Sequence, residues 1–187
     1  MIDFEKLTES INAVNEVLND LEVETKAIKR NVDNEKKEMF IIMFNDVLKY
    51  FQLIKKAYGN KIPTSFGLTM TYDDGHQIRI AKDWHCGNYY CCLKVRNDLC
   101  DEWFPIEYIY EKYIDEGKCN ESIFENLNRS PKSVKWLVDV VAIDWDFYKI
   151  QIENLVATHV NNIITERSKK MHEEYEHILN EAERLGV

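Results

Sequence analysis

Residues 66–80 read FGLTMTYDDGHQIRI, and this stretch decides the fold because the hydrophobic period changes here from helical to two. Six apolar residues alternate with small or polar ones on either side of the turn signal Asp73-Asp74-Gly75: Phe66, Leu68, Met70 and Tyr72, then Ile78 and Ile80. This pattern is typical of a β-hairpin. A third run over residues 89–96 follows Gly87-Asn88, so the sequence predicts a three-stranded antiparallel sheet.

A sheet of this size needs a helix against one face, and the preceding segment supplies one. Residues 34–58 carry a broad apolar and aromatic stripe, made of Met39, Phe40, Met43, Phe44, Val47, Leu48, Phe51 and Ile54. Asp33-Asn34 offers a cap or a turn before this helix. Gly59 and Pro63 end it. We therefore expect a core helix over residues 34–58 that covers the sheet.

The N-terminal segment has a narrower pattern, with apolar residues alternately three and four positions apart. The row contains Phe4, Leu7, Ile11, Val14, Leu18, Leu21, Thr25, Ile28 and Val32. Two apolar positions in seven are typical of a coiled-coil seam, whereas a helix on a globular core shows a wider face. We predict a coiled coil over residues 1–33. The alternative is a single amphipathic helix that lies on the core.

The C-terminal helix is expected to begin at Ser130-Pro131 and to continue to residue 185, about 80 Å at ~1.5 Å per residue. Residues 134–160 are dense in apolar residues and read as core. Heptads return afterwards, at Ile164, Ser168, Met171, Tyr175, Ile178, Ala182 and Leu185. The predicted fold is α+β and predominantly helical, with coiled-coil helices at 1–33 and 161–187 around a body at 34–160. The two ends pair as an arm within one chain, or they form a homodimer.

Acidic residues concentrate between the sheet and the last helix. Residues 99–130 carry eight acidic and three basic residues, a net charge of −5 out of −9 for the whole chain. A helix is expected from Pro105 to Gly117, with Glu107, Glu111 and Asp115 on one ridge. We predict that a mixed acidic and aromatic surface binds a partner through Asp101, Glu102, Trp103, Glu107, Tyr108, Glu111, Asp115 and Glu116. The alternative is an ordinary solvated face.

The sequence contains few candidates for chemistry. His85 and four of the five cysteines fall close together, but no CxxC-type pair supports zinc. Cys91 and Cys92 are adjacent in a strand, so they point to opposite faces. The clustered cysteines Cys86, Cys91, Cys92 and Cys100 are expected to be buried structural thiols. No P-loop, GxGxxG or G-x-S-x-G motif is present. We predict a protein that is not an enzyme and that uses no metal or cofactor. A thiol- or metal-dependent enzyme centred on His85 and Cys86 is the alternative.

Composition sets the remaining expectations. The net charge of −9 argues against direct binding to nucleic acid, and no apolar run approaches the ~18 residues of a membrane span. We expect a cytoplasmic, non-enzymatic protein that binds another protein. The finer hypothesis is an acidic regulator or inhibitor, viral or bacterial, that occupies the basic groove of a nucleic-acid-binding protein, as small phage-encoded inhibitors do. A structural coiled-coil dimerisation protein is a further alternative.

Overall fold

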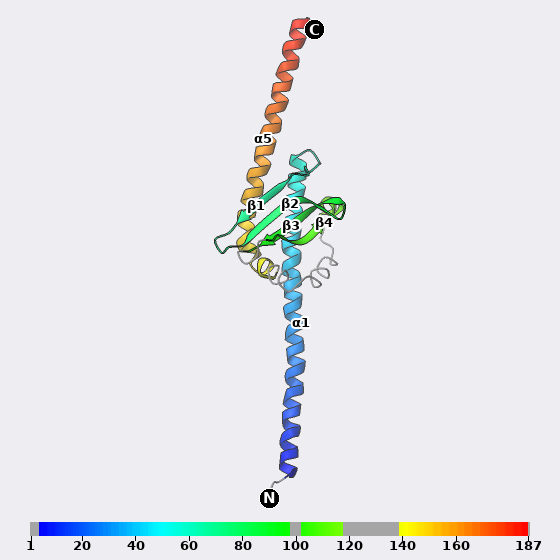
Figure 1. Ribbon diagram of the computed structural model, residues 1–187, viewed down its shortest axis with the longest axis vertical. Helices are drawn as coiled ribbons and strands as arrows, with labels where there is room; N and C mark the ends of the chain where they lie inside the picture. The colour runs from blue at the N-terminus through cyan, green and yellow to red at the C-terminus, as the bar shows by residue number, and fades with distance from the viewer. Residues whose placement is uncertain (1–3, 98–101, 118–138, 187) are drawn as a thin grey trace. The chain divides into compact units, whose positions relative to one another are not determined.

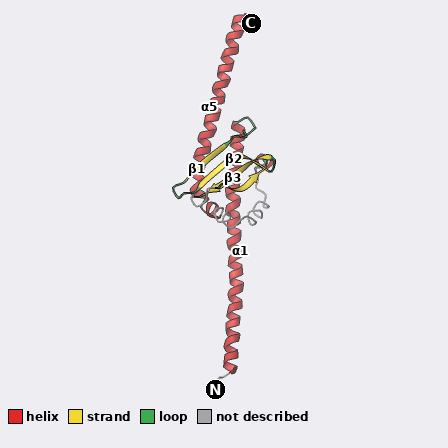
Figure 2. Ribbon diagram, viewed as in Figure 1, coloured by secondary structure: helices red, strands yellow, loops and turns green. Residues whose placement is uncertain are grey.

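The computed structural model describes residues 4–97, 102–117 and 139–186 (Figure 1). They fall into two compact units, Met1–Met39 and Phe40–Val187. The second unit contains a four-stranded antiparallel sheet in the order β1-β2-β3-β4. Its strands are β1 (Gly67–Thr71), β2 (Gln77–His85), β3 (Asn88–Arg96) and β4 (Phe104–Ile109). The described helices are α1 (Phe4–Ala57), α2 (Glu111–Glu116) and α5 (Trp145–Leu185). The predicted α+β, mostly helical fold class is therefore confirmed (Figure 2).

The predicted hairpin is present, and its turn is tied to α5. Tyr72 N–H bonds the His76 carbonyl at 2.9 Å, and Gly75 N–H bonds the Tyr72 carbonyl at 3.0 Å. The Tyr72 hydroxyl donates to the Tyr148 carbonyl at 2.9 Å, and the Tyr148 hydroxyl donates to Asp74 at 2.8 Å. Two buried tyrosines thus fix the β1–β2 turn against the first turns of α5.

One hydrophobic core joins the sheet to two helices, which cover the same face of it (Figure 1). Helix α1 contributes Phe40, Met43, Phe44, Val47, Leu48, Tyr50, Phe51 and Ile54; the sheet contributes Ile78, Ile80, Cys91, Leu93, Val95, Ile106 and Ile109; and α5 contributes Trp145, Tyr148, Ile152 and Val156. The stripe predicted over residues 34–58 is therefore core from Phe40 onward, whereas Met39, which was predicted to belong to it, is exposed. Apolar burial on this scale is the main stabilising term of such a unit.

A buried carboxylate links the two helices of this core. Asp46 accepts hydrogen bonds from the Trp145 indole at 3.1 Å and from Lys149 at 2.9 Å, and Lys49 adds a third contact at 3.0 Å. Burial by itself raises the pKa of Asp46, but these bonds outweigh it and hold the pKa below its ordinary value. The charge is therefore paired, which a carboxylate in this position requires.

Helix α1 runs through the break expected at Asp33-Asn34 and ends as predicted. Asp and Asn lower helix propensity by only a fraction of a kcal/mol, and no Gly or Pro interrupts the segment. At the end, Gly59 and Asn60 both have positive φ, and their N–H groups bond the Lys56 and Lys55 carbonyls at 3.0 and 2.8 Å. This is a Schellman cap.

The segment after β3 was predicted wrongly. Phe104–Ile109 is the fourth strand instead of the start of a helix, and only Glu111–Glu116 is helical. The strand pairs with β3, with an irregularity between Leu93 and Lys94. Pro105 fits this position because β4 is an edge strand, where a missing N–H is tolerated.

Helix α5 is continuous through Asn161-Asn162. Its 41 residues correspond to about 60 Å at ~1.5 Å per residue. Ile163 is the last residue of α5 to be buried, and every side chain from 164 to 181 is exposed. The expected continuous helix from Ser130-Pro131 to residue 185 is wrong in its described part, because residues 139–143 are helical, Asp144 is a turn and α5 begins only at Trp145. Ser130-Pro131 itself lies outside the described residues.

Candidate functional site

The N-terminal seam predicted from the sequence is an exposed apolar row on α1. We call Ile11, Val14, Leu18, Leu21, Thr25, Ile28 and Val32 the α1 row; its large apolar members are 47–57% exposed. Every side chain from residue 8 to residue 35 is exposed. The side chains of Phe4 and Leu7 lie outside the described residues. The described part of the seam therefore has an apolar surface that the unit itself does not cover.

A second exposed row follows α5 at alternating spacings of three and four. We call Phe147, Ile150, Asn154, Ala157, Asn161, Ile164, Ser168, Met171, Tyr175, Ile178, Ala182 and Leu185 the α5 row; its large apolar members are 52–69% exposed. From Ile164 onward these are the predicted seam residues. The row continues back to Phe147, which the sequence analysis missed because residues 134–160 read as core throughout. The uninterrupted heptad spacing was the signal that could have found it.

The α5 row lies mostly on the side of the helix that faces away from the core, although the Phe147 ring is also 6.1 Å from that of the core residue Tyr72. At ~100° per residue, Phe147 and Asn154 are roughly opposite Trp145 and Ile152, which are buried. A shallow apolar groove of about 340 Å³ lies beside it, lined by Tyr50, Leu53, Glu153, Val156, Ala157, Val160 and Asn161. Because Ala157 and Asn161 line both features, the row and the groove form one continuous surface.

The predicted acidic surface is only partly assembled. Glu107 lies in β4 whereas Glu111 and Asp115 lie in α2, so the expected helical ridge does not exist. Glu111 pairs with Lys82 at 2.8 Å, and Asp115 pairs with Lys55 at 2.6 Å. Both carboxylates therefore hold α2 against the body.

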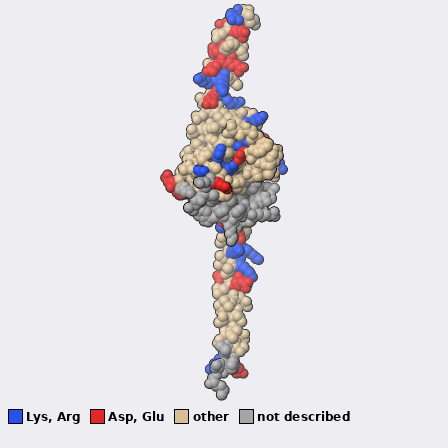
Figure 3. All heavy atoms as spheres, in the orientation of Figure 1, with Lys and Arg blue, Asp and Glu red and all other residues tan. Residues whose placement is uncertain are grey.

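The other members of that surface are dispersed. Glu102 and Glu116 are exposed, whereas Trp103 and Tyr108 are half-buried. Arg96 lies over the Trp103 ring at 5.1 Å, and Tyr108 stacks on His85 at 4.0 Å. Asp101 and the side chain of Glu107 lie outside the described residues. In Figure 3 basic and acidic side chains lie close together over the sheet, so charge there is mixed.

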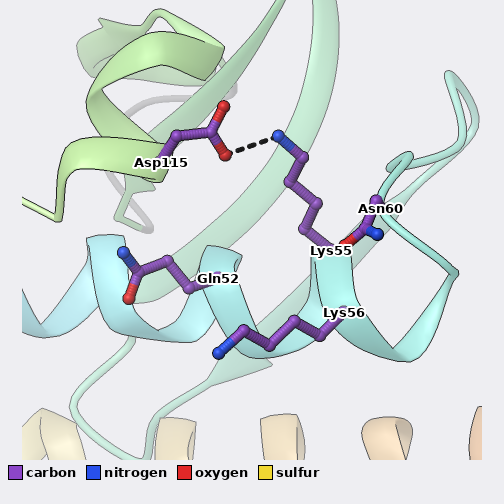
Figure 4. A pocket seen from close by; sticks show the side chains of 5 residues that line it. All are labelled: Gln52, Lys55, Lys56, Asn60 and Asp115. Carbon is purple, nitrogen blue, oxygen red and sulfur yellow. Dashed lines mark hydrogen bonds and ion pairs between the residues drawn. The ribbon is translucent and has the colours of Figure 1, made fainter.

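The junction between α1 and α2 contains a polar pocket of about 330 Å³ (Figure 4). It is lined by Gln52, Lys55, Lys56, Asn60 and Asp115. Lys55 is committed to Asp115, and the Gln52 amide donates to the Ile114 carbonyl at 2.6 Å. The polar groups at this pocket mainly serve to dock α2, and Lys56 points away from the Lys55–Asp115 pair (Figure 4).

The cysteines of the sheet behave differently from one another. Cys91 and Cys92 are fully buried on opposite faces, and burial raises the pKa of their thiols to about 12 and about 11. Cys86 is exposed, so the expectation of a buried thiol is wrong there. Cys100, which the same expectation covered, lies outside the described residues. It lies in the two-residue β2–β3 turn at φ 46°, where Gly87 also has positive φ. Its Sγ is 3.2 Å from His85 Nε2.

His159 lies half-buried at the edge of the core. Its Nε2 is 3.1 Å from the Tyr58 hydroxyl, and its ring is 5.6 Å from that of Phe66. A cleft of about 520 Å³ opens beside it, lined also by Asn162, Ile163, Glu166, Arg167 and Lys170. Arg167 donates to the Ala57 carbonyl at 2.5 Å, so it caps α1. The cleft is a helix junction with mixed charge.

No three His, Cys, Asp or Glu side chains converge on a possible metal position anywhere in the described ranges. Neither α1 nor α5 contains, in its described residues, an apolar stretch that could cross a bilayer. Most of the large apolar side chains that are exposed among the described residues lie on α1 and α5. Comparison with family models, with curated proteins and with solved structures found no match.

Proposed function

We infer that this protein binds other protein chains through coiled-coil pairing of its long helices. The observation that carries this inference is the α1 row, because residues 8–35 form a regular helix in which no side chain is buried. Isolated helices are marginal in water, and most helices are stabilised by packing of an apolar face. A helix of this length with a heptad row is therefore completed by a partner helix.

The sheet and its hydrophobic core support this role because they anchor both helices. This core includes the last turns of α1 and the first turns of α5, so both helices are anchored by buried side chains. The α5 row then continues through residues 164–185 without a buried contact. Exposed apolar surface of this extent is unusual on a monomer and marks interaction sites.

The finer hypothesis of an acidic regulator in a basic groove has less support. It needs acidic side chains that are available to a partner, whereas Glu111 and Asp115 are engaged by Lys82 and Lys55. Exposed ion pairs of this kind are weak, so a partner with a denser basic surface could compete for them. This hypothesis stays a prediction.

Thiol chemistry at the β2–β3 turn is the candidate from a different class. The 3.2 Å contact of Cys86 Sγ with His85 Nε2 places a nucleophile beside a base, as thiol catalysis requires. Among the described residues, however, His85 is held by stacking on Tyr108, and no side chain hydrogen-bonds its other ring nitrogen. The imidazole therefore lacks the orienting partner of a catalytic triad.

The proposed function is tested by hydrogen–deuterium exchange on the full chain. Amides of residues 8–35 should be protected in a concentration-dependent way, because pairing with a second chain covers the row. Leu18→Glu places a charge in the row and should abolish this protection. Asn19→Glu, one position away and off the row, should leave it intact. Exchange as fast as in an unstructured peptide at every concentration would contradict the proposal.

A further inference from the structure

Polar residues recur every seven positions among the apolar residues of the α5 row. In heptad notation Phe147, Asn154, Asn161, Ser168, Tyr175 and Ala182 occupy the a position, while Ile150, Ala157, Ile164, Met171, Ile178 and Leu185 occupy d. Three successive a positions are therefore polar. A polar group buried in a seam is costly unless it meets another polar group, which is how such residues select a register.

We propose that the α5 row binds the α5 row of a second copy of this chain, parallel and in register. This rests on the proposed function and names the partner of one of its two rows. In a parallel, in-register pair each a residue faces the same residue of the other copy. Asn154 meets Asn154, Asn161 meets Asn161, and Ser168 meets Ser168. Each of these polar side chains therefore has a hydrogen-bonding partner in the other copy.

Antiparallel pairing is disfavoured because it sets unlike residues against one another. The two antiparallel registers with the fullest overlap place Asn154 opposite Met171 or opposite Ile178 of the second copy. They also place Asn161 opposite Ile164 or Met171. Each arrangement leaves amide groups buried against apolar side chains without a partner, which a stable interface avoids.

The flanking charges point to the same orientation. In those antiparallel registers the g positions face each other, and Glu153 lies beside Glu174 or Glu181 of the second copy. Glu153 also accepts a hydrogen bond from the Tyr50 hydroxyl at 3.0 Å, which holds its carboxylate at the groove. Like charges at flanking positions repel and set the orientation of a coiled coil. In the parallel register Glu153 lies beside Thr158 and Glu174 beside Leu179, so this repulsion is absent.

The body leaves room for the second helix. Trp145, Tyr148 and Ile152 hold α5 to the core on one side, while the row faces the other side. The groove beside Leu53 lies along the same surface, with Ala157 and Asn161 shared. A second α5 would therefore cover the row and border the groove without displacing core residues.

Cysteine cross-linking tests the orientation directly. Met171→Cys, made in a Cys86→Ser background, should give mostly covalent dimer under mild oxidation, because the two d residues face each other only in the parallel register. Glu173→Cys, at the outward f position, is the matched control and should give little. The Cys86→Ser protein alone measures the background from the remaining cysteines. If Met171→Cys fails to cross-link while a Met171→Cys and Asn154→Cys mixture does, the parallel register is overturned.

A second measurement separates this inference from the proposed function. The mass of the full chain in solution should be twice the 22.2 kDa of one chain. Replacing Asn154 and Asn161 together by leucine should keep the dimer but lower the Met171→Cys cross-link, because orientation is no longer selected. A dimer without the cross-link overturns the parallel register and leaves coiled-coil binding standing. A dimer in which residues 8–35 are protected while residues 164–185 exchange rapidly overturns the α5 row as the site of self-association and leaves the proposed function standing. A monomer without protection in either segment overturns both.

Discussion

The cysteines show how far a single residue can be placed from the sequence. Strand alternation correctly puts Cys91 and Cys92 on opposite faces, because side chains alternate along any strand. It also predicts their burial, since free cysteine is among the most buried residue types. Cys86 was assigned with them, but it lies in the turn that joins β2 to β3. Hydrophobic patterning does not locate a turn to the nearest residue, so it could not show that Cys86 lies in one.

This difference predicts selective thiol labelling. In the native protein a maleimide should modify Cys86 rapidly and Cys91 and Cys92 very slowly, because the buried thiols carry raised pKa values and form little thiolate near neutral pH. Peptide mapping by mass spectrometry reads out the sites. In denaturant all three should react alike. Equal labelling of Cys91 and Cys86 in native buffer would show that the sheet core is not packed as described.

His159 predicts a dependence of stability on pH. Burial lowers the pKa of His159 below its ordinary 6.5, although the nearby Glu166 carboxylate opposes the shift. The unfolded state then binds the proton more readily than the folded state. Neutral His159 therefore adds to the free energy of unfolding. This stabilisation is full above about pH 6.5 and is lost as the pH falls through the folded-state pKa of His159.

The measurement is urea denaturation from about pH 7 down to pH 5. The free energy of unfolding should decline over this window in the wild type, and His159→Gln should flatten the decline. His172→Gln changes an exposed histidine on the free end of α5 and is expected to leave the slope alone. A wild-type slope preserved in His159→Gln would assign the titration to another group.

Element prediction succeeded where one pattern dominated and failed where two patterns fitted. The core helix and the first hairpin each had a single period, and both were found. In residues 104–113 the apolar residues Ile106, Ile109, Tyr110 and Tyr113 fit a helical face, yet Phe104 and Ile106 also alternate as in a strand. Pairing with β3 resolved this ambiguity, and such pairing depends on tertiary structure. The acidic ridge was lost with the helix that carried it.

Helix α2 provides a prediction at this scale. Gly117 ends it at φ 64°, and a Cβ there would lie 2.8 Å from Gln52 Nε2, the amide that bonds Ile114. Gly117→Ala should therefore lower the free energy of unfolding by more than the ~1–2 kcal/mol of a left-handed residue alone. Gly186→Ala is the matched control, because Gly186 has φ 73° and open space around its Cβ position. Thermal or urea denaturation compares the two. Equal effects would mean that Gln52 moves aside without cost.

At the scale of the molecule, the sequence predicted the α+β class but not the extent of the C-terminal seam. Dense apolar composition in residues 134–160 hid the fact that two faces of one helix are apolar, one buried and one exposed. Only tertiary packing shows which of the two faces is buried in the core. Pairing of the two terminal helices with each other stays a prediction, as do the acidic partner surface and the absence of enzymatic activity.

Dimerisation makes the stability of the whole molecule depend on concentration. If α5 pairs with a second copy, the folded state is favoured by mass action, and the melting temperature should rise with protein concentration. Met171→Glu should remove the dependence by placing a charge in the seam, whereas Glu173→Gln should retain it. Differential scanning calorimetry over a broad concentration range measures this. A constant melting temperature for the wild-type chain, with its mass that of a monomer, would contradict the prediction.

Because α5 is continuous from Trp145 to Leu185, its buried part fixes the direction in which its exposed side chains point. Because α5 continues without a break past Ile163, its last buried residue, the rotation of the outer seam about the helix axis is fixed by side chains buried in the core. One alanine inserted after Ser168 would turn everything beyond it by ~100° and set Met171 out of phase with Phe147 and Ile150. Seven inserted residues would restore the phase to within ~20° while lengthening the rod. Evolution can therefore extend this helix in whole heptads far more readily than by single residues.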